Sequence, residues 1–213
     1  LKGDLGHDRK DISGLIKVFY ETFKLTKRRP SLVIKTSGAD FSHIDRREIR
    51  SKIEQVKGTM AVNDLPDVYF IHGDLSEKQM NHLYNHSKVK AHVSFTKGEG
   101  YGRPLAEASC SGKIVVAPNW SGHIDFLDPK FSILLNGKVT EVHDSAVWEG
   151  VIEKGSGWYY VDYASAATML KNLYNNQKAY KSRGHKQAKH IRDNFSLDKM
   201  KEDFKELVKT QFP

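Results

Sequence analysis

The sequence predicts an α/β protein with a doubly wound, mostly parallel Rossmann-like sheet, helices on both faces and further helices at the C-terminal end. Three observations support this fold class. Short apolar runs, typical of buried parallel strands, alternate with segments of helical periodicity. A glycine-rich loop joins one such run to a helix over residues 95–104. The 213 residues are 38% hydrophobic, which is enough for one sizeable domain with its own core.

Each element follows from a local pattern of apolar spacing, caps and breakers. In chain order, the predicted elements are a helix over 12–23, a strand over 31–35 closed by Ser37 and Gly38, a helix over 44–56 ending at Gly58, a strand over 66–73, a helix opened by a capping box of Ser76 and Gln79, a strand over 91–95, a short helix from Pro104, and strands over 114–117, 131–135 and 158–161. Residues 136–157 are predicted to be irregular, and helical patterns then run to the C-terminal end.

The stretch from residue 91 to residue 117 is the centre of the prediction. A strand is followed by a loop with glycines at 98, 100 and 102, then by a helix and a second strand. A loop of this kind lets the backbone approach a phosphate closely. The helix N-terminus adds unpaired N–H groups and a dipole that contributes roughly 0.3–1 kcal/mol per charge. We therefore expect this loop to hold a diphosphate, although its glycines could also serve only a tight turn.

Two carboxylates belong to this region: Glu99 lies within the loop and Glu107 in the following helix, with seven residues between them. The motif reads Glu-Gly-Tyr-Gly, four residues, Glu-Ala, then Gly-x-Ile-Val-Val and Ser-Gly-x-x-Asp. This order resembles the donor-binding signature of retaining GT-B glycosyltransferases of family 4. The coincidence of spaced carboxylates, paired glycines and a following strand makes the resemblance far more specific than a lone G-x-G.

The resemblance implies a role for each residue of the motif. Glu107 would hold the ribose hydroxyls of a nucleotide-sugar, and Glu99 would face the donor sugar as a catalytic residue. The remaining donor contacts that the resemblance implies are those of Gly100, Tyr101 and Gly102 with the distal phosphate, of Ser121, Gly122 and His123 with the sugar hydroxyls, and of Gly73 and Leu75 with the base.

The N-terminal turn resembles the family less closely. Lys10 matches the lysine that neutralises the donor diphosphate ahead of the first helix, and it is the second predicted catalytic residue. Asp4 stands where the family has an arginine, and Arg9 is the candidate substitute. A carboxylate in place of that arginine would oppose the negative charge that develops on the leaving phosphate.

Charge and composition bound the partners. The net charge of +8 favours anionic ligands, and no nucleic-acid-binding motif accompanies it, so we expect a nucleotide-sugar and no nucleic acid. The basic C-terminal third, 178–209, is interspersed with acids; a solvated helix face is the favoured interpretation and contact with membrane headgroups the alternative. There is no run of 18 apolar residues and no secretory leader. A lone Cys110 fits a reducing compartment, so a cytoplasmic location is expected.

No metal or cofactor is predicted. His82 and His86 are four residues apart on one helix, but no third ligand with suitable spacing joins them. GT-B enzymes are in general metal-independent, which the resemblance extends to this chain.

Three functions remain open from the sequence. The first is the donor-binding half of a retaining transferase that moves a hexose to a glycan, lipid or protein acceptor, with residues 1–213 as one Rossmann-like domain and the N-terminal acceptor domain outside this chain. The second is a non-catalytic nucleotide- or glycan-binding module of a larger assembly, and the third is a nucleic-acid-binding or structural surface protein, inferred from the charge alone.

Overall fold

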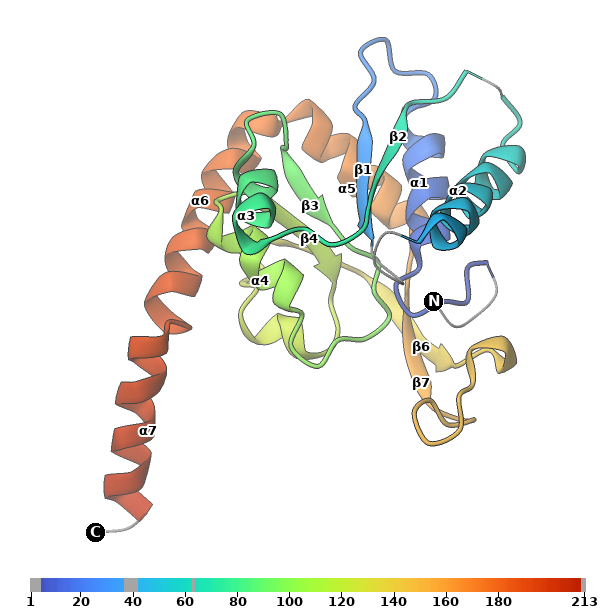
Figure 1. Cartoon of the computed structure of the whole chain (residues 1–213). Helices are drawn as coiled ribbons and strands as arrows, with labels where there is room; N and C mark the ends of the chain where they lie inside the picture. Colours follow the sequence, from blue (N-terminus) through green and yellow to red (C-terminus); the bar gives the residue numbers. More distant parts are fainter. Residues whose placement is uncertain (1–4, 37–41, 63, 212–213) are drawn as a thin grey trace.

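The computed structural model of the chain describes residues 5–36, 42–62 and 64–211, and its strands form two parallel groups and one antiparallel pair (Figure 1). The strands are β1 (Leu32–Thr36), β2 (Val68–His72), β3 (Ala91–Val93), β4 (Ile114–Pro118), β5 (Ile133–Leu135), β6 (Gly137–Glu141) and β7 (Gly157–Val161). Strand β1 pairs with β2, strand β4 lies between β3 and β5, and β6 pairs with β7. The order β3-β4-β5 places consecutive strands side by side, each reached through a crossover.

Helices cover both faces of the parallel strands. The helices of the described residues are α1 (Ile12–Phe23), α2 (His43–Gly58), α3 (Glu77–Asn85), α4 (Arg103–Cys110), α5 (Tyr163–Asn175), α6 (Gln177–Asn194) and α7 (Leu197–Gln211), with short 3-10 turns at Gly122–Asp125 and Asp144–Ala146. Strand β4 is buried along its whole length. Its side chains alternate between two cores: Ile114 and Val116 pack with α1, α2 and α5, whereas Val115 and Ala117 pack with α4 and Ile191 of α6. The predicted doubly wound α/β fold is confirmed.

Local sequence signals set several element boundaries. The Ser76 hydroxyl accepts from the Gln79 N–H at 3.3 Å, and the Gln79 side chain accepts from the Ser76 N–H at 2.8 Å, so the predicted capping box is confirmed. The Ser42 hydroxyl caps α2 by accepting from the Asp45 N–H. Ser37 and Gly38, which were expected to close the first strand, lie outside the described residues.

One prediction for residues 136–157 is wrong. Strand β6 lies within this segment and pairs with β7, with Val139 opposite Tyr159. The strand is mostly exposed, so its residues Gly-Lys-Val-Thr-Glu lack the apolar run by which the buried strands were recognised. Its register depends on Gly137, because a Cβ at this position would lie 2.1 Å from the Tyr160 carbonyl oxygen.

The last helix, α7, extends away from the body of the molecule (Figure 1). This helix carries large apolar side chains that are exposed; they are Leu197, Met200, Phe204, Leu207 and Val208. Within the described residues, no helix has the length and apolar character needed to cross a membrane.

The packing of α6 on the loop before β4 generates a stability prediction. A Cβ at Gly184 would lie 2.5 Å from the Gly112 carbonyl oxygen and 2.8 Å from the Ile114 nitrogen, and backbone atoms cannot move aside. We expect Gly184→Ala to destabilise the protein by about 1–3 kcal/mol despite the better helix propensity of alanine. Gly58 is the matched control: it ends α2 with nothing within 4 Å of its virtual Cβ, so Gly58→Ala should stabilise by about 0.5–1 kcal/mol. Urea unfolding of both variants measures this; equal effects would contradict the packing argument.

Candidate functional site

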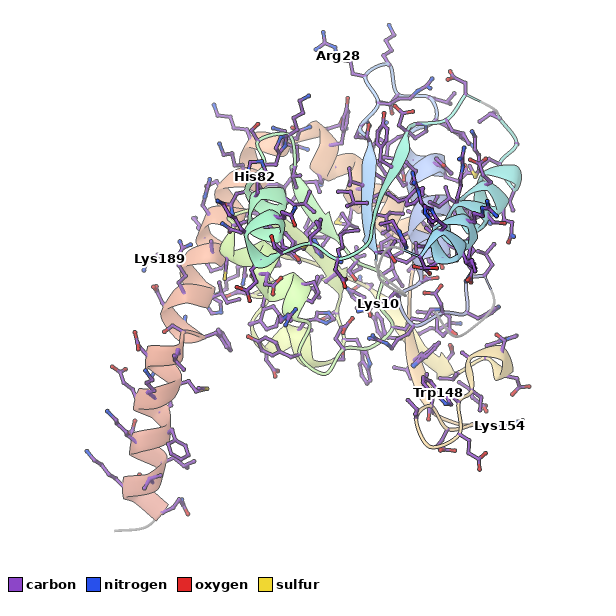
Figure 2. The ribbon with its side chains drawn as sticks, viewed as in Figure 1. Lys10, Arg28, His82, Trp148, Lys154 and Lys189 are labelled. Carbon is purple, nitrogen blue, oxygen red and sulfur yellow. The ribbon has the colours of Figure 1, made fainter. Side chains whose placement is uncertain are left out.

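Three segments meet at the carboxyl ends of β3 and β4: the N-terminal turn (residues 5–11), the glycine loop (residues 94–102) and the loop after β4 (residues 119–122). The Lys97 N–H donates to the Arg9 carbonyl at 2.8 Å, and the Gly122 N–H donates to the Glu99 carbonyl at 3.1 Å. The first of these backbone hydrogen bonds joins segments that are about 90 residues apart in the sequence. Lys10 lies in this region, with Trp148 and Lys154 further out on the β6–β7 side (Figure 2).

Glu99 is the residue on which the polar contacts of the site converge. Its carboxylate accepts a hydrogen bond from the Thr96 hydroxyl at 2.8 Å, lies 3.2 Å from the Arg9 guanidinium and forms an ion pair with Lys10. Only 13% of the side chain is exposed. Burial by itself raises the pKa of Glu99, but the hydrogen bonds from Lys10 and Thr96 and the charges of Lys10 and Arg9 outweigh it and hold the pKa below its usual value. The carboxylate is therefore ionised at neutral pH.

The two cations remain accessible beside this carboxylate. The exposed fractions are 43% for the Arg9 side chain and 33% for Lys10. Arg9 also donates to the Gly98 carbonyl at 2.7 Å, which fixes its guanidinium at the glycine loop. Asp4, which stands at the arginine position of the family pattern, lies outside the described residues. The structure brings together Glu99, Lys10 and Arg9 as one cluster.

The glycines of the loop allow close backbone approach. A Cβ at Gly122 would lie 1.8 Å from the Gly100 carbonyl oxygen, so only glycine fits there. Gly102 has a φ of 87° and immediately precedes α4, whose first turn contains Pro104. Tyr101, between Gly100 and Gly102, is 51% exposed, and the centre of its ring lies 5.0 Å from that of the Phe126 ring. The loop is thus held by its glycines and by one aromatic contact.

His123 is fully buried under the loop. Its Nε2 donates to the Pro118 carbonyl at 2.7 Å, so Nδ1 is the acceptor nitrogen of the neutral ring, and it has no hydrogen-bond partner within the described residues. Burial lowers the pKa of His123, while the Pro118 bond and the Glu99 charge oppose that shift. The ring is therefore neutral, and any contact with a sugar hydroxyl would use Nδ1 as an acceptor.

Glu107 lies in the second turn of α4 and belongs to a different set of contacts. Its carboxylate is 3.1 Å from Arg103, and its side chain is 41% exposed. Burial, together with the adjacent Glu107 carboxylate, raises the pKa of Tyr84 to about 12. Gly73 and Leu75 follow β2, in the other strand group, and the contacts that build the Glu99 cluster involve neither residue. The predicted base-binding residues are thus not joined to the cluster by these bonds.

The sequence analysis missed Lys97, which has no exposed side-chain surface. Its ammonium donates to the Gly6 carbonyl at 2.7 Å, lies 3.8 Å from the Asp11 carboxylate and is 4.4 Å from the centre of the Tyr160 ring. Burial lowers the pKa of Lys97, and burial raises the pKa of Asp11. The only signal in the sequence was a lysine two residues after an apolar run, and a lysine in such a place is usually a surface residue.

Asp11 completes this buried group from the start of α1. Its carboxylate accepts from the Tyr163 hydroxyl at 2.6 Å, and a Cβ at Gly14 would lie 2.0 Å from that hydroxyl oxygen. Gly14 therefore makes room for the contact between α1 and α5. Asp11 itself has a φ of 45°, in the left-handed region.

The family profile described as Glycosyl transferases group 1 matches residues 7–154, more than half of the chain. The chain belongs to this family. The comparison with curated protein sequences gives no match.

Solved structures share the fold. Sucrose-phosphate synthase from Thermosynechococcus elongatus superposes with a TM-score of 0.63 at 14% identity, over 96% of this chain and 43% of its own. HepE from Anabaena, in complex with UDP and glucose, gives 0.62 at 14% identity, over 95% and 45%. A mutant of S. aureus TarM, in complex with Fondaparinux, alpha-GlcNAc-glycerol and UDP, gives 0.62 at 19% identity, over 94% and 33%. The fold is that of a Rossmann-like domain of GT-B glycosyltransferases, and the chain spans less than half the length of these relatives.

Ser121 generates a prediction that separates hydrogen bonding from backbone strain. Its φ of 71° and ψ of −170° lie in a region that only glycine adopts freely, while its hydroxyl accepts from the Glu99 N–H at 3.0 Å. Ser121→Ala should destabilise the protein by about 1–3 kcal/mol, because it keeps the strain and leaves the Glu99 N–H unpaired. Ser121→Gly loses the same bond but relieves the strain, so it should exceed the alanine variant in stability by about 1–3 kcal/mol. Urea unfolding decides the order; at an unstrained position alanine would be the more stable of the two.

A further prediction concerns Lys97. We expect Lys97→Met to destabilise the protein by about 3–5 kcal/mol, because it leaves the Asp11 carboxylate buried without its charge partner. Lys154→Met is the control: this side chain is 73% exposed, and its surface ion pair with Asp144 is worth about 0–1 kcal/mol. Chemical denaturation at pH 7 measures both, and similar losses for the two variants would contradict the role of the buried pair.

The same variant has a defined pH dependence. Burial raises the folded-state pKa of Asp11 above its ordinary 3.8. Below pH 3.8 the carboxyl group is protonated in both the folded and the unfolded protein and costs little stability. Its cost grows as pH rises from 3.8 through the folded-state pKa. Removing the Lys97 charge raises this pKa further. The deficit of Lys97→Met relative to the parent should therefore be smaller near pH 4 than at pH 7.

Proposed function

We propose that this chain is the donor-binding half of a retaining GT-B glycosyltransferase, which transfers a hexose from a nucleoside-diphosphate sugar to a glycan, lipid or protein acceptor. The observation that carries the proposal is the convergence of Arg9, Lys10 and Glu99 at the glycine loop ahead of α4. Membership of the group 1 family supports it.

The cluster has the charges that departure of a diphosphate requires. Arg9 and Lys10 place two cations beside one carboxylate, and the glycine loop leads directly into the N-terminus of α4, whose dipole favours a negative charge there. A diphosphate here competes with Glu99 for the two cations. The negative charge that develops as the sugar–phosphate bond breaks is then stabilised by preorganised groups, which lower the barrier without a side-chain nucleophile.

Glu99 has a role that its own contacts favour. Thr96 holds one oxygen of the carboxylate, and the backbone N–H of Glu99 is bound by Ser121, so the residue keeps its position when a cation changes partner. An ionised carboxylate at this point can accept from sugar hydroxyls and stabilise positive charge on the sugar ring. The acceptor and its binding residues belong to the rest of the GT-B enzyme in this proposal.

The first experiment is a thermal-shift and calorimetry panel of UDP, GDP and ADP with UDP-glucose and GDP-mannose. UDP comes first because the HepE and TarM structures contain it. A ligand present at 100 times its dissociation constant adds about 2.7 kcal/mol, which corresponds to a rise in Tm of about 5–10 °C for a chain of this size. A protein that binds none of these ligands would contradict the proposal. Binding by a full-length enzyme that transfers no sugar would favour the non-catalytic module.

Glu107 provides the matched mutational prediction. If its carboxylate accepts from the ribose hydroxyls, Glu107→Ala should weaken binding of the tightest nucleotide by about 1.5–3 kcal/mol, roughly tenfold to a hundredfold. Glu202→Ala, an exposed carboxylate on α7, should leave the dissociation constant unchanged. Calorimetric titration of both folded variants measures this. Equal affinity for Glu107→Ala and the parent would leave Glu107 only as the partner of Arg103 and Tyr84.

A further inference from the structure

Trp120 presents an exposed aromatic face at the edge of the candidate site. Its ring stacks on that of Tyr159 with centroids 5.9 Å apart and planes within 4° of parallel, yet 42% of the residue is exposed. At this centroid distance the two parallel rings are offset, so Tyr159 supports only part of the Trp120 ring and much of the ring stays accessible. A large aromatic side chain left open beside a polar cluster points to a ligand more than to the core.

The ring beneath Trp120 is fixed in place. Tyr159 is buried, its hydroxyl donates to the Leu135 carbonyl at 3.2 Å, and its N–H donates to the Lys97 carbonyl at 3.0 Å. Tyr159 is therefore anchored both to β5 and to the loop that carries Glu99. A ligand that stacks on Trp120 meets a surface that is already ordered, so it loses little free energy in organising it.

The backbone ties Trp120 to the Glu99 cluster. The next residue, Ser121, accepts from the Glu99 N–H, and Gly122 donates to the Glu99 carbonyl. The strained φ of Ser121 sets the direction in which the chain leaves Trp120. The aromatic face thus lies one residue from the backbone bonds that hold the proposed sugar-facing carboxylate.

We propose that Trp120 is the stacking platform for a pyranose ring in this site, an inference that rests on the proposed function. One face of a pyranose carries axial C–H groups, which are slightly positive, and the face of an indole is negative, so the two stack while the sugar hydroxyls point outward to polar groups. The sugar is either the donor hexose or a sugar unit of the acceptor. Both sources have the same chemistry at the ring, and the arms of the test distinguish them.

Two other exposed aromatic residues serve as comparisons. Trp148 is 49% exposed, but it lies out on the β6–β7 side of the molecule (Figure 2). Tyr101 packs on Phe126 at an interplanar angle of 49°, so it has no parallel ring behind it. Trp148 is the matched control for the test.

The test measures Trp120→Ala, Trp120→Phe and Trp148→Phe by calorimetry with UDP, GDP, UDP-glucose and GDP-mannose, and by ligand-observed NMR with methyl α-glucoside and methyl α-mannoside. If the donor hexose stacks on Trp120, the alanine variant should bind the nucleotide-sugars about tenfold more weakly than the parent, the loss expected when an aromatic stacking contact is removed. Its dissociation constants for the free nucleotides should stay within about twofold of those of the parent. The phenylalanine variant should retain most of the affinity, and Trp148→Phe all of it. If an acceptor sugar stacks there, only the methyl glycosides should lose binding.

Unchanged binding of all these probes by Trp120→Ala would overturn the proposal. If Trp120→Ala does not fold, the Trp148→Phe variant provides a second test, because Trp120 is then the exposed tryptophan that remains. The tryptophan fluorescence of this variant should change when a saturating nucleotide-sugar or glycoside is added. Unchanged fluorescence would also overturn the proposal. Failure of every nucleotide to bind the parent would contradict the proposed function alone, since the glycoside arm tests Trp120 without nucleotide.

Discussion

The buried ammonium of Lys97 is the constraint on which the site depends. A charge without exposed surface must recover the hydration it loses, and the Gly6 carbonyl, the Asp11 carboxylate and the Tyr160 ring together surround this one. These partners come from the N-terminal turn, from the start of α1 and from β7. The backbone of Lys97 also forms hydrogen bonds with Arg9 and Tyr159. Lys97 therefore joins three parts of the site: the N-terminal turn that carries the two cations, the glycine loop that carries Glu99, and β7. The geometry of the cluster therefore follows from one buried charge.

Strain is concentrated around the same point. The positive-φ residues other than glycine within the described chain are Asp11 and Ser121, and they flank the cluster from its two sides. Each costs of order 1–3 kcal/mol and persists only because its surroundings determine it: Asp11 through Tyr163 and the Lys97 ammonium, Ser121 through the Glu99 N–H. In both cases the strained backbone places the side chain where it can accept its hydrogen bond. The strain is thus coupled to the position of Lys10 on one side and Glu99 on the other.

Much of the fold and part of the site could be predicted from the sequence, because these parts are encoded locally. The run Ile114–Ala117, the helix after Gly102 and the capping box at Ser76 each carry their own signal in a few consecutive residues. Strand β6 could not be recognised, since an exposed strand needs no apolar run, and Lys97 could not, since its burial depends on partners about 90 residues away. The resemblance assigned Lys10 and Glu99 separate roles toward the donor, and their ion pair is found only in the structure.

In the proposed function the site binds an anion although a carboxylate lies at its centre, and the distribution of charge supports this. The ionised Glu99 offsets one of the two cations, so the three side chains together carry one net positive charge beside the loop that leads into the N-terminus of α4. Because both cations are partly exposed, they can exchange the carboxylate for a phosphate without a large desolvation cost, whereas Lys97, fully buried and bound to backbone, cannot. The site thus separates two kinds of positive charge: an inner one that fixes the geometry and a partly exposed outer pair, to which the proposed function assigns the diphosphate. Substituting the outer pair should change affinity far more than stability, and substituting the inner lysine should do the reverse.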